Sequence, residues 1–226
     1  MIGILPAAGH ATRMMGLPKM LLPIPGETTL IGRMRDSMAA LKARKICIGA
    51  NGVNMALLEP LDRNTTNLYH AYTATMSETV LLAQAVPGAN EPVIFGMPDT
   101  YIEDEDVFLK LIGALDAGAD VAVGLFVTPS ELRHKRGMCR VENDRVVEVI
   151  DKPKQSDWFW AWGVLAWKPV FWGCINPIDP HVGYAVQRAI GEKLDVCAVT
   201  ICTHGRGFWD CGTPEEYFGL IRYLGA

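Results

Sequence analysis

The sequence lacks the features that mark secreted, membrane and nucleic-acid-binding proteins. Its six cysteines are scattered and include no C-x-x-C pair, which argues against a zinc site or a disulfide scaffold. No apolar run reaches the length of a transmembrane helix, and no polybasic run accompanies the net charge of -4. We therefore expect buried free thiols in a reducing, cytoplasmic compartment, with neither membrane nor nucleic acid as a partner.

Internal repeats and low-complexity linkers are also absent. Residues 1–8 are apolar, but this run is short and has no basic region before it, so we expect a strand there rather than a signal peptide. Half of the 226 residues are hydrophobic, which is enough to bury one sizeable core. These properties predict a single domain over residues 1–226.

Short apolar segments alternate with helix-like segments in the first half of the chain. The alternation predicts an α/β fold with a Rossmann-like, mixed but mainly parallel sheet flanked by helices. Thr28 or Thr29 can cap the first helix, and Ser77 can cap the next. The expected strands are Ile2–Ala7, Lys45–Ala50, Val93–Met97 and Asp120–Phe126, and the expected helices follow Thr29, run from Ser77 to Gln84 and span Val107–Ala117.

The pattern changes after Pro129. Asn143-Asp144 lies between two apolar segments and predicts a hairpin turn, so we expect a small antiparallel subregion in this half. The change divides the single domain into two halves, residues 1–129 and residues 130–226. The segments expected here are strands Met138–Glu142, Val146–Ile150, Val164–Trp167 and Val196–Ile201, and helices Tyr184–Ile190 and Pro214–Leu224.

A glycine-bearing basic loop follows the first expected strand, in the stretch LPAAGHATRMMGLPKMLLPI. Such a loop can turn successive backbone N–H groups toward one point at the carboxyl edge of a parallel sheet, where these folds bind ligands. Arg13 offers a planar fork of donors to phosphate oxygens, and Lys19 offers a compact charge. Taken alone, the loop is better explained as a surface loop whose basic residues are solvated.

Two aspartates are placed to reach the same edge. Asp99 follows the apolar strand that starts at Val93, and Asp210 follows Phe208-Trp209. Paired carboxylates at one edge suit Mg²⁺ bound together with phosphates. Each residue also has a structural explanation, because Asp99 could form a turn and Asp210 could lead into a helix.

Five of these segments, in this order and spacing, resemble the sugar-1-phosphate nucleotidyltransferases, a family that includes glucose-1-phosphate thymidylyltransferase. The resemblance covers nearly the whole chain and implies the nucleotidyltransferase fold of the GT-A-like type. Its anchors are Leu5-Pro6-Ala7-Ala8-Gly9 with Thr12-Arg13, Pro18-Lys19-Met20-Leu21-Leu22-Pro23, Asp99, Val149-Ile150-Asp151-Lys152-Pro153 with Gly163, and Trp209-Asp210-Cys211-Gly212-Thr213-Pro214-Glu215.

The resemblance implies a role for each matching position. The partners would be a nucleoside triphosphate, bound mainly by residues 1–129, and a phosphorylated small-molecule acceptor, bound mainly by residues 130–226. Mg²⁺ would be the cofactor, and a homo-oligomer is allowed. Arg13, Lys19 and Lys152 would be catalytic, and Asp99 and Asp210 would hold the metal. The nucleotide-binding residues would be Ala7, Ala8, Gly9, His10, Ala11, Thr12, Arg13 and Ser77, and the acceptor-binding residues would be Gly137, Asp151, Lys152, Trp162 and Gly163.

The chain departs from the family pattern at several positions. Ala11 replaces the usual second glycine of the loop, Pro98 replaces the glycine before Asp99, and Asp151 replaces a glutamate. The shorter Asp151 side chain puts its sugar contact in question. The segment Thr75–Thr79 falls where the family reads the base, but it does not indicate which base.

Other motifs have simpler structural explanations. Asp104-Glu105-Asp106 is similar to a metal-binding D-x-D motif, but acids at a helix start also complement the helix dipole. We expect only Trp162 of the aromatic run to approach a ligand, and only His10 of the five histidines to lie near the site. The basic cluster Arg133, Lys135 and Arg136 is either solvated or covers phosphates.

The resulting hypothesis is an enzyme that joins a nucleoside triphosphate to a sugar 1-phosphate and releases pyrophosphate. One alternative is a cytidylyltransferase acting on phosphocholine or another phosphorylated alcohol, since tryptophans can cage a quaternary ammonium. Another is a non-catalytic nucleotide sensor. A glycosyltransferase is a further alternative, against which the lysine-bearing loop argues.

Overall fold

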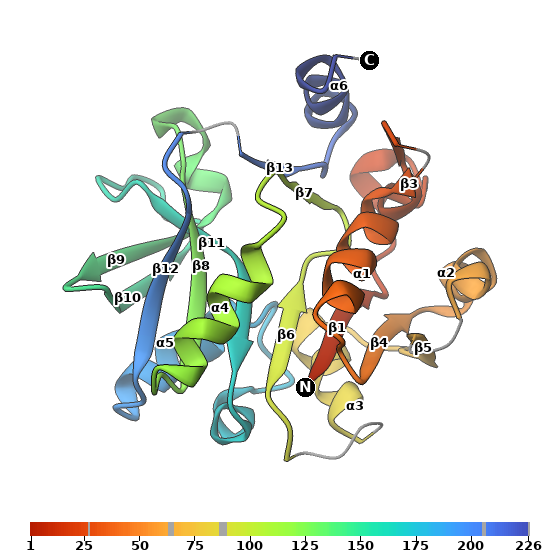
Figure 1. Cartoon of the computed structure of the whole chain (residues 1–226). Coiled ribbons are helices and arrows are strands. Elements are labelled where there is room, and N and C mark those ends of the chain that lie inside the picture. Colours follow the sequence, from red (N-terminus) through yellow and green to blue (C-terminus); the bar gives the residue numbers. More distant parts are fainter. Residues whose placement is uncertain (27, 63–65, 86–89, 205–206, 226) are drawn as a thin grey trace.

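The computed structural model describes residues 1–26, 28–62, 66–85, 90–204 and 207–225. A nine-stranded mixed sheet forms the centre of the molecule, and helices cover both of its faces (Figure 1). This arrangement confirms the α/β class predicted from the alternation of apolar and helical segments.

The strands of the large sheet lie in the order β5-β4-β1-β6-β11-β8-β12-β10-β9. Strands β10 and β11 run antiparallel to their neighbours, whereas the remaining adjacent pairs are parallel. Two short antiparallel pairs, β2–β3 and β7–β13, lie outside it. The bounds are β1 Ile2–Ala7, β2 Pro23–Ile24, β3 Thr28–Thr29, β4 Lys45–Ala50, β5 Thr66–His70, β6 Val93–Gly96, β7 Thr100–Ile102, β8 Val121–Val127, β9 Gly137–Glu142, β10 Arg145–Asp151, β11 Trp160–Trp167, β12 Val196–Cys202 and β13 Phe208–Asp210.

Helices α1 and α4 pack on one face of the sheet, and α3 and α5 pack on the other (Figure 1). In the described ranges, no helix has both the length and the apolar character needed to cross a membrane. The α-helices are α1 Leu30–Ala40, α2 Gly52–Leu58, α3 Met76–Gln84, α4 Val107–Asp116, α5 Gly183–Gly191 and α6 Pro214–Tyr223, and the 3₁₀ helices are Thr12–Met14, Lys19–Leu21, Glu59–Leu61, Ser130–Lys135 and Pro169–Cys174.

The core follows the two-residue period of the strands. Ile4 packs with the side of the sheet that α3 and α5 cover, whereas its neighbour Leu5 packs with the side that α1 and α4 cover. Both side chains are fully buried, as expected for a central parallel strand with helices on both faces. The apolar run at the start of the chain is therefore a central strand, as predicted.

Local signals in the sequence located most turns and caps. Thr29 caps α1 by accepting a hydrogen bond from the Gly32 N–H at 3.1 Å. Asn143 and Asp144 both have positive φ, 48° and 59°, which is the conformation of a tight two-residue hairpin. The predicted N-cap of α3 was wrong by two positions. Its cap is Thr75, while Ser77 lies inside the helix with its side chain in the core.

The strand ends bring distant parts of the chain to one edge of the sheet. The parallel strands β1, β4 and β6 all end there, at Ala7, Ala50 and Gly96. Strand β13 returns to this edge by pairing with β7, which opposes Asp210 to Thr100. The carboxyl edge of the sheet is therefore where the loop, the aspartates and the C-terminal segment meet.

Candidate active site

A continuous cleft lies at the carboxyl edge of the parallel strands. It consists of two adjoining pockets, of about 220 and 380 Å³, which share Lys19, Met76, Met97 and Asp99 as lining residues. The first pocket is built by the N-terminal half of the chain. The second is built mainly by residues after 130 and opens beside Asp210.

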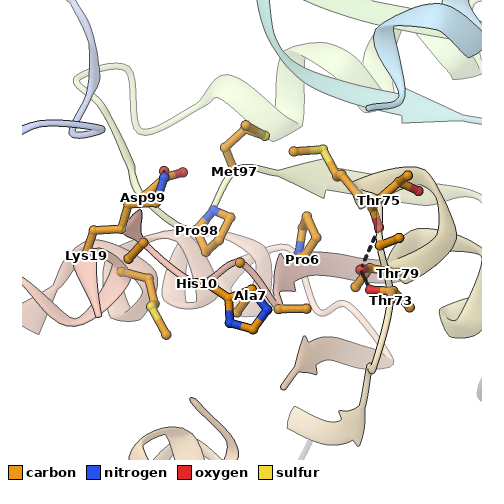
Figure 2. Close-up of a pocket in the computed structure, with 16 residues that line it drawn as sticks. Pro6, Ala7, His10, Lys19, Thr73, Thr75, Thr79, Met97, Pro98 and Asp99 are labelled. Atoms are coloured by element: carbon orange, nitrogen blue, oxygen red, sulfur yellow. Dashed lines mark hydrogen bonds and ion pairs between the residues drawn. The ribbon is translucent and has the colours of Figure 1, made fainter. Parts of the chain in front are cut away.

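The loop after β1 forms one wall of the first pocket (Figure 2). Lys19 and Asp99 lie on one side of this pocket, and three threonines lie on the other. The hydroxyls of Thr73 and Thr79 share a hydrogen bond of 2.5 Å. The lining residues are Pro6 to Ala11, Lys19, Met20, Thr73 to Met76, Thr79, Met97, Pro98 and Asp99.

Two buried asparagines of α2 fix the conformation of this loop. The Asn51 amide donates to the Ala8 carbonyl at 2.8 Å, and the Asn54 amide donates to the carbonyls of Ala7 and Gly9 at 2.6 and 3.1 Å. In a trans peptide the N–H points opposite to the preceding C=O. Three successive N–H groups, of residues 8 to 10, therefore point away from α2, which is the arrangement of an anion-binding nest.

Two residues of the loop show how its backbone is constrained. A Cβ added to Gly9 would meet no atom within 4 Å, so nothing in the fold itself requires a glycine there. Ala11 has a φ of 48°, the left-handed region in which glycine is favoured. Ala11 thus holds the conformation that suits the family's usual second glycine, and it does so against a steric cost.

The two aspartates lie close together. The Cys211 N–H donates to the Asp99 carbonyl at 3.0 Å, in register with the β7–β13 pairing. Burial raises the pKa of Asp210, and the negative charge of Asp99 raises it further, whereas Arg136 and Lys19 act in the opposite direction. The mutual repulsion of the carboxylates is therefore part of the electrostatics of the cleft.

Each of these carboxylates has a cationic partner. Lys19 forms an ion pair with Asp99, and Arg136 forms one with Asp210. The Asp99 and Arg136 side chains are 6% and 13% exposed, whereas their partners Lys19 and Asp210 are 24% and 27% exposed, so water screens each pair from one side only. Asp99 and Asp210 lie side by side, and their carboxylate oxygens are the type of donor that a hard divalent cation such as Mg²⁺ prefers.

The chain supplies only part of a coordination sphere for that cation. Over the described ranges, no group of three or more His, Cys, Asp or Glu side chains converges to hold a metal. Two carboxylates leave most positions of an Mg²⁺ ion to water or to ligand oxygens. This is the way in which proteins usually bind Mg²⁺ with phosphates.

The second pocket contains the residues predicted to bind an acceptor. Lys152 follows β10 and has a φ of 44°, an uncommon conformation for a residue other than glycine. Its N–H donates to the Arg136 carbonyl at 2.9 Å. The neighbouring Asp151 carboxylate lies 2.9 Å from Nε2 of His181. The hairpin end therefore presents a lysine and a partnered carboxylate to the same pocket.

The glycines of this pocket have packing roles in addition to lining it. A Cβ on Gly137 would lie 2.1 Å from Nε1 of Trp162, and one on Gly183 would lie 2.8 Å from the same atom. A Cβ on Gly163 would lie 2.3 Å from the Phe208 ring. Gly137 thus admits the Trp162 indole, and Gly163 admits the Phe208 ring, which stacks on Phe126.

Comparison with protein families gives a match over residues 3–170 to the MobA-like NTP transferase domain. The chain belongs to this nucleotidyltransferase family. No curated protein sequence is significantly similar to it. Membership confirms the general resemblance to nucleotidyltransferases that was predicted from the loop, the aspartates and the Asp151-Lys152-Pro153 segment.

Solved structures share the fold at low sequence identity. A protein described as a glucose-1-phosphate thymidylyltransferase from Bacillus anthracis, in complex with a sucrose, matches with a TM-score of 0.81 and 14% identity, over 99% of this chain and 95% of that one. UDP-glucose pyrophosphorylase complexed with UDP-glucose matches with a TM-score of 0.80 and 16% identity, over 99% and 97%. Its apo form matches with a TM-score of 0.81 and 17% identity, over 99% and 96%.

The structure brings most of the predicted site residues of this nucleotidyltransferase together. Ser77 is the exception, since it is fully buried and does not line the cleft, where Thr73, Thr75 and Thr79 lie instead. Thr12 begins a 3₁₀ helix, and its side chain is outside the described part of the structure. The predicted residues that line the cleft are Ala7, Ala8, Gly9, His10, Ala11, Arg13, Lys19, Asp99, Gly137, Asp151, Lys152, Trp162, Gly163 and Asp210.

Sequence reasoning missed several residues of the cleft. His181 was expected to have a surface or packing role, but it lines the second pocket and contacts Asp151. No local pattern pointed to it. Asn51, which holds the loop of the first pocket through the Ala8 carbonyl, was also missed. Asn51 directly follows β4, and a position directly after a strand is the signal that pointed to Asp99, so the same signal could have found Asn51. Glu216, in the first turn of α6, also lines the second pocket.

Several structural explanations favoured by the sequence are correct. Asp104 pairs with Lys110 and accepts a hydrogen bond from the Asp106 N–H, so the acidic triplet supports the start of α4. Of the tryptophans placed by the structure, only Trp162 lines the cleft. In the basic cluster, Arg133 donates to the carbonyls of Thr128 and Ser156, whereas Lys135 and Arg136 face the cleft.

Proposed function

We propose that this nucleotidyltransferase couples a nucleoside triphosphate to a sugar 1-phosphate, giving a nucleoside-diphosphate sugar and pyrophosphate. One observation supports this most directly. Arg13 and Lys152 line the second pocket, and among the described residues neither takes part in an ion pair. Uncompensated cations in a cleft are suited to anionic ligands.

The reaction needs this charge because both substrates are anions. A sugar-phosphate oxygen would attack the α-phosphorus in line, and pyrophosphate would leave from the opposite side. At ~4 Å, two unit charges repel by about 1 kcal/mol in water and by about 4 kcal/mol at an effective dielectric of about 20. Positive side chains beside the triphosphate and beside the acceptor phosphate would offset this repulsion.

Each part of the cleft has a role in this proposal. The backbone N–H groups of residues 8 to 10 and Arg13 would hold the phosphates of the triphosphate, with Lys19 beside the α-phosphate. Lys152 would bind the phosphate of the acceptor, and Asp151 would accept a hydrogen bond from its sugar. No protein nucleophile is required, because positioning and charge stabilisation account for catalysis of phosphoryl-type transfer.

Asp99 and Asp210 would hold Mg²⁺, which supplies charge neutralisation at the phosphate oxygens when bound. The carboxylates must exchange their present partners for the metal. Lys19 and Arg136 would then be free to turn toward phosphate oxygens. The compartment proposed for the reaction is the cytoplasm.

The acceptor pocket favours a sugar over a quaternary ammonium. A cage for such a cation needs several free aromatic faces. Trp162 and Phe208 line the pocket, but the Phe208 ring already stacks on Phe126 and lies beneath the Arg136 guanidinium. The Trp162 indole N–H is buried against Gly137 and Gly183. The polar groups Asp151 and His181 at the pocket suit hydroxyls.

The test is pyrophosphate release by the purified protein with common nucleoside triphosphates and a panel of phosphorylated acceptors. We expect turnover with at least one sugar 1-phosphate in the presence of Mg²⁺. Turnover with phosphocholine alone would overturn the sugar assignment. Tight triphosphate binding without pyrophosphate release from any acceptor would identify a nucleotide sensor instead.

Lys152→Ala separates the two substrates of this reaction. We expect the KM for the acceptor to rise about tenfold or more, with a smaller change in the KM for the triphosphate, because one charge-assisted phosphate contact is lost. Steady-state kinetics with each substrate varied in turn would measure this. An equal rise in both KM values would remove Lys152 from the acceptor site.

A further inference from the structure

We infer that Arg136 is a further phosphate-binding residue of this cleft. In the ligand-free protein, Arg136 pairs with Asp210 at the position proposed for the metal. When the metal binds, Arg136 moves to the phosphate of the acceptor. The inference rests on the proposed function for its second half, the transfer to phosphate. Its first half, competition between Arg136 and a cation for Asp210, can be tested without any reaction.

The position of Arg136 connects the two halves of the cleft. Its guanidinium is paired with Asp210, the last residue of β13. Its carbonyl accepts the hydrogen bond from the Lys152 N–H, so the two residues are neighbours at the end of the β9–β10 hairpin. Arg136 is therefore held between the candidate metal ligand and the candidate acceptor ligand.

The packing of Arg136 also suits a side chain that moves between two partners. Its Cζ atom lies 5.8 Å from the centroid of the Phe208 ring, which lines the same pocket. A guanidinium over an aromatic face stays stabilised while its N–H groups turn toward a different anion. The planar fork of donors also matches phosphate oxygens.

The electrostatics favour an exchange of partners. Asp99 and Asp210 are already neutralised by Lys19 and Arg136, and a divalent cation added beside them would meet two positive side chains. Departure of Arg136 from Asp210 would remove one of these charges and free the paired carboxylate oxygen for the metal. A phosphate bound by Lys152 would be an anion able to receive it, because Lys152 and Arg136 line the same pocket.

The test compares Mn²⁺ binding to the ligand-free wild type, Arg136→Met and Arg136→Lys, by water proton relaxation at mildly alkaline pH. Arg136→Met removes the competing charge but keeps much of the apolar stem. We expect it to bind Mn²⁺ about tenfold more tightly, as follows from removing one unit charge beside the ion. Arg136→Lys, which keeps the charge, should stay close to the wild type.

The matched control is Arg140→Met. Arg140 lies on β9, the strand that begins directly after Arg136, but pairs with Glu142 and Glu148 on the surface. The Mn²⁺ affinity of the Arg140→Met variant should equal that of the wild type. Far-UV circular dichroism and thermal unfolding of each variant would show that the fold is retained. Unchanged or weaker Mn²⁺ binding by folded Arg136→Met would overturn the inference, as would absence of Mn²⁺ binding by all four proteins.

Kinetics with the acceptor test the second half. With an active wild type, Arg136→Met should raise the KM for the acceptor about tenfold, and Arg136→Lys should restore part of the loss. A merely structural role would weaken Mn²⁺ binding and acceptor binding together, whereas partner exchange moves them in opposite directions. If Mn²⁺ binding tightens but no acceptor is ever used, the proposed function fails while the competition at Asp210 stands.

Discussion

Gly9 shows how a single residue can be required by a ligand rather than by the fold. Open space surrounds the position of its missing Cβ, and its backbone is not in the left-handed region. An alanine would therefore fit the ligand-free protein without strain. Its methyl group would stand at the wall of the first pocket, beside the N–H groups proposed to hold phosphates.

Gly9→Ala should leave the protein at least as stable as the wild type and raise the KM for the triphosphate about tenfold. The stability expectation follows because alanine restricts the unfolded chain more than glycine does, by about 0.4–1 kcal/mol. Urea unfolding and steady-state kinetics would measure the two effects. An unchanged KM would show that phosphates do not approach this part of the loop.

Gly113→Ala is the matched control. Gly113 also has open space at its Cβ position but lies in α4, outside the cleft. The substitution should stabilise the protein by about 0.5–1 kcal/mol, since alanine favours helix interiors over glycine, and should not change the KM.

At the scale of elements, the start of α3 joins the two pockets. Thr75 caps this helix by accepting a hydrogen bond from the Glu78 N–H at 3.0 Å, and its hydroxyl donates to the Pro177 carbonyl at 2.5 Å. The next N–H, of Met76, donates to the Pro180 carbonyl at 3.1 Å. His181, which contacts Asp151, directly follows Pro180 in the sequence.

Thr75→Val should lower the free energy of unfolding by about 1 kcal/mol and weaken triphosphate binding, because valine keeps the shape but loses both hydrogen bonds. Thr75→Ser keeps the hydroxyl and should behave nearly as the wild type. Urea unfolding and a thermal-shift titration with triphosphate would compare them. Equal behaviour of the valine and serine variants would contradict a capping role.

At the scale of the whole molecule, two strands far apart in the sequence, β7 and β13, set the acid–base behaviour of the cleft. The β7–β13 pairing places Asp210 beside Asp99 and partly buries it, and this partial burial together with the neighbouring charge raises the pKa of Asp210 above its usual value. As the pH falls through this raised pKa, Asp210 takes up a proton. The protonated carboxyl cannot serve as a ligand of Mg²⁺.

Activity should therefore be lost on the acidic side at a higher pH than an ordinary aspartate would give. Added Mg²⁺ should move the midpoint of this loss to lower pH, because the metal and the proton compete for the same carboxylate. Rate–pH profiles at low and high Mg²⁺ would measure the shift. A midpoint that does not depend on Mg²⁺ would assign the acidic loss to another group.

Much of this architecture could be predicted from local sequence. The strand Ile2–Ala7, the cap at Thr29 and the turn at Asn143-Asp144 each depend on residues next to one another, so periodicity and turn preferences located them. The start of α3 was missed because Ser77 and Thr75 are both good caps. Tertiary contact with Pro177 and Pro180 accompanies the choice of Thr75.

The sequence by itself determined the fold class, the edge of the sheet at which the site lies, and the residue types available there, because these follow from strand periodicity and from what directly follows each strand. Only the tertiary structure decided which charges face each other. The pairing of Lys19 with Asp99, Arg136 with Asp210 and His181 with Asp151 joins residues 30 to 80 positions apart. Such pairs depend on how the strands and loops pack, and no local pattern encodes them.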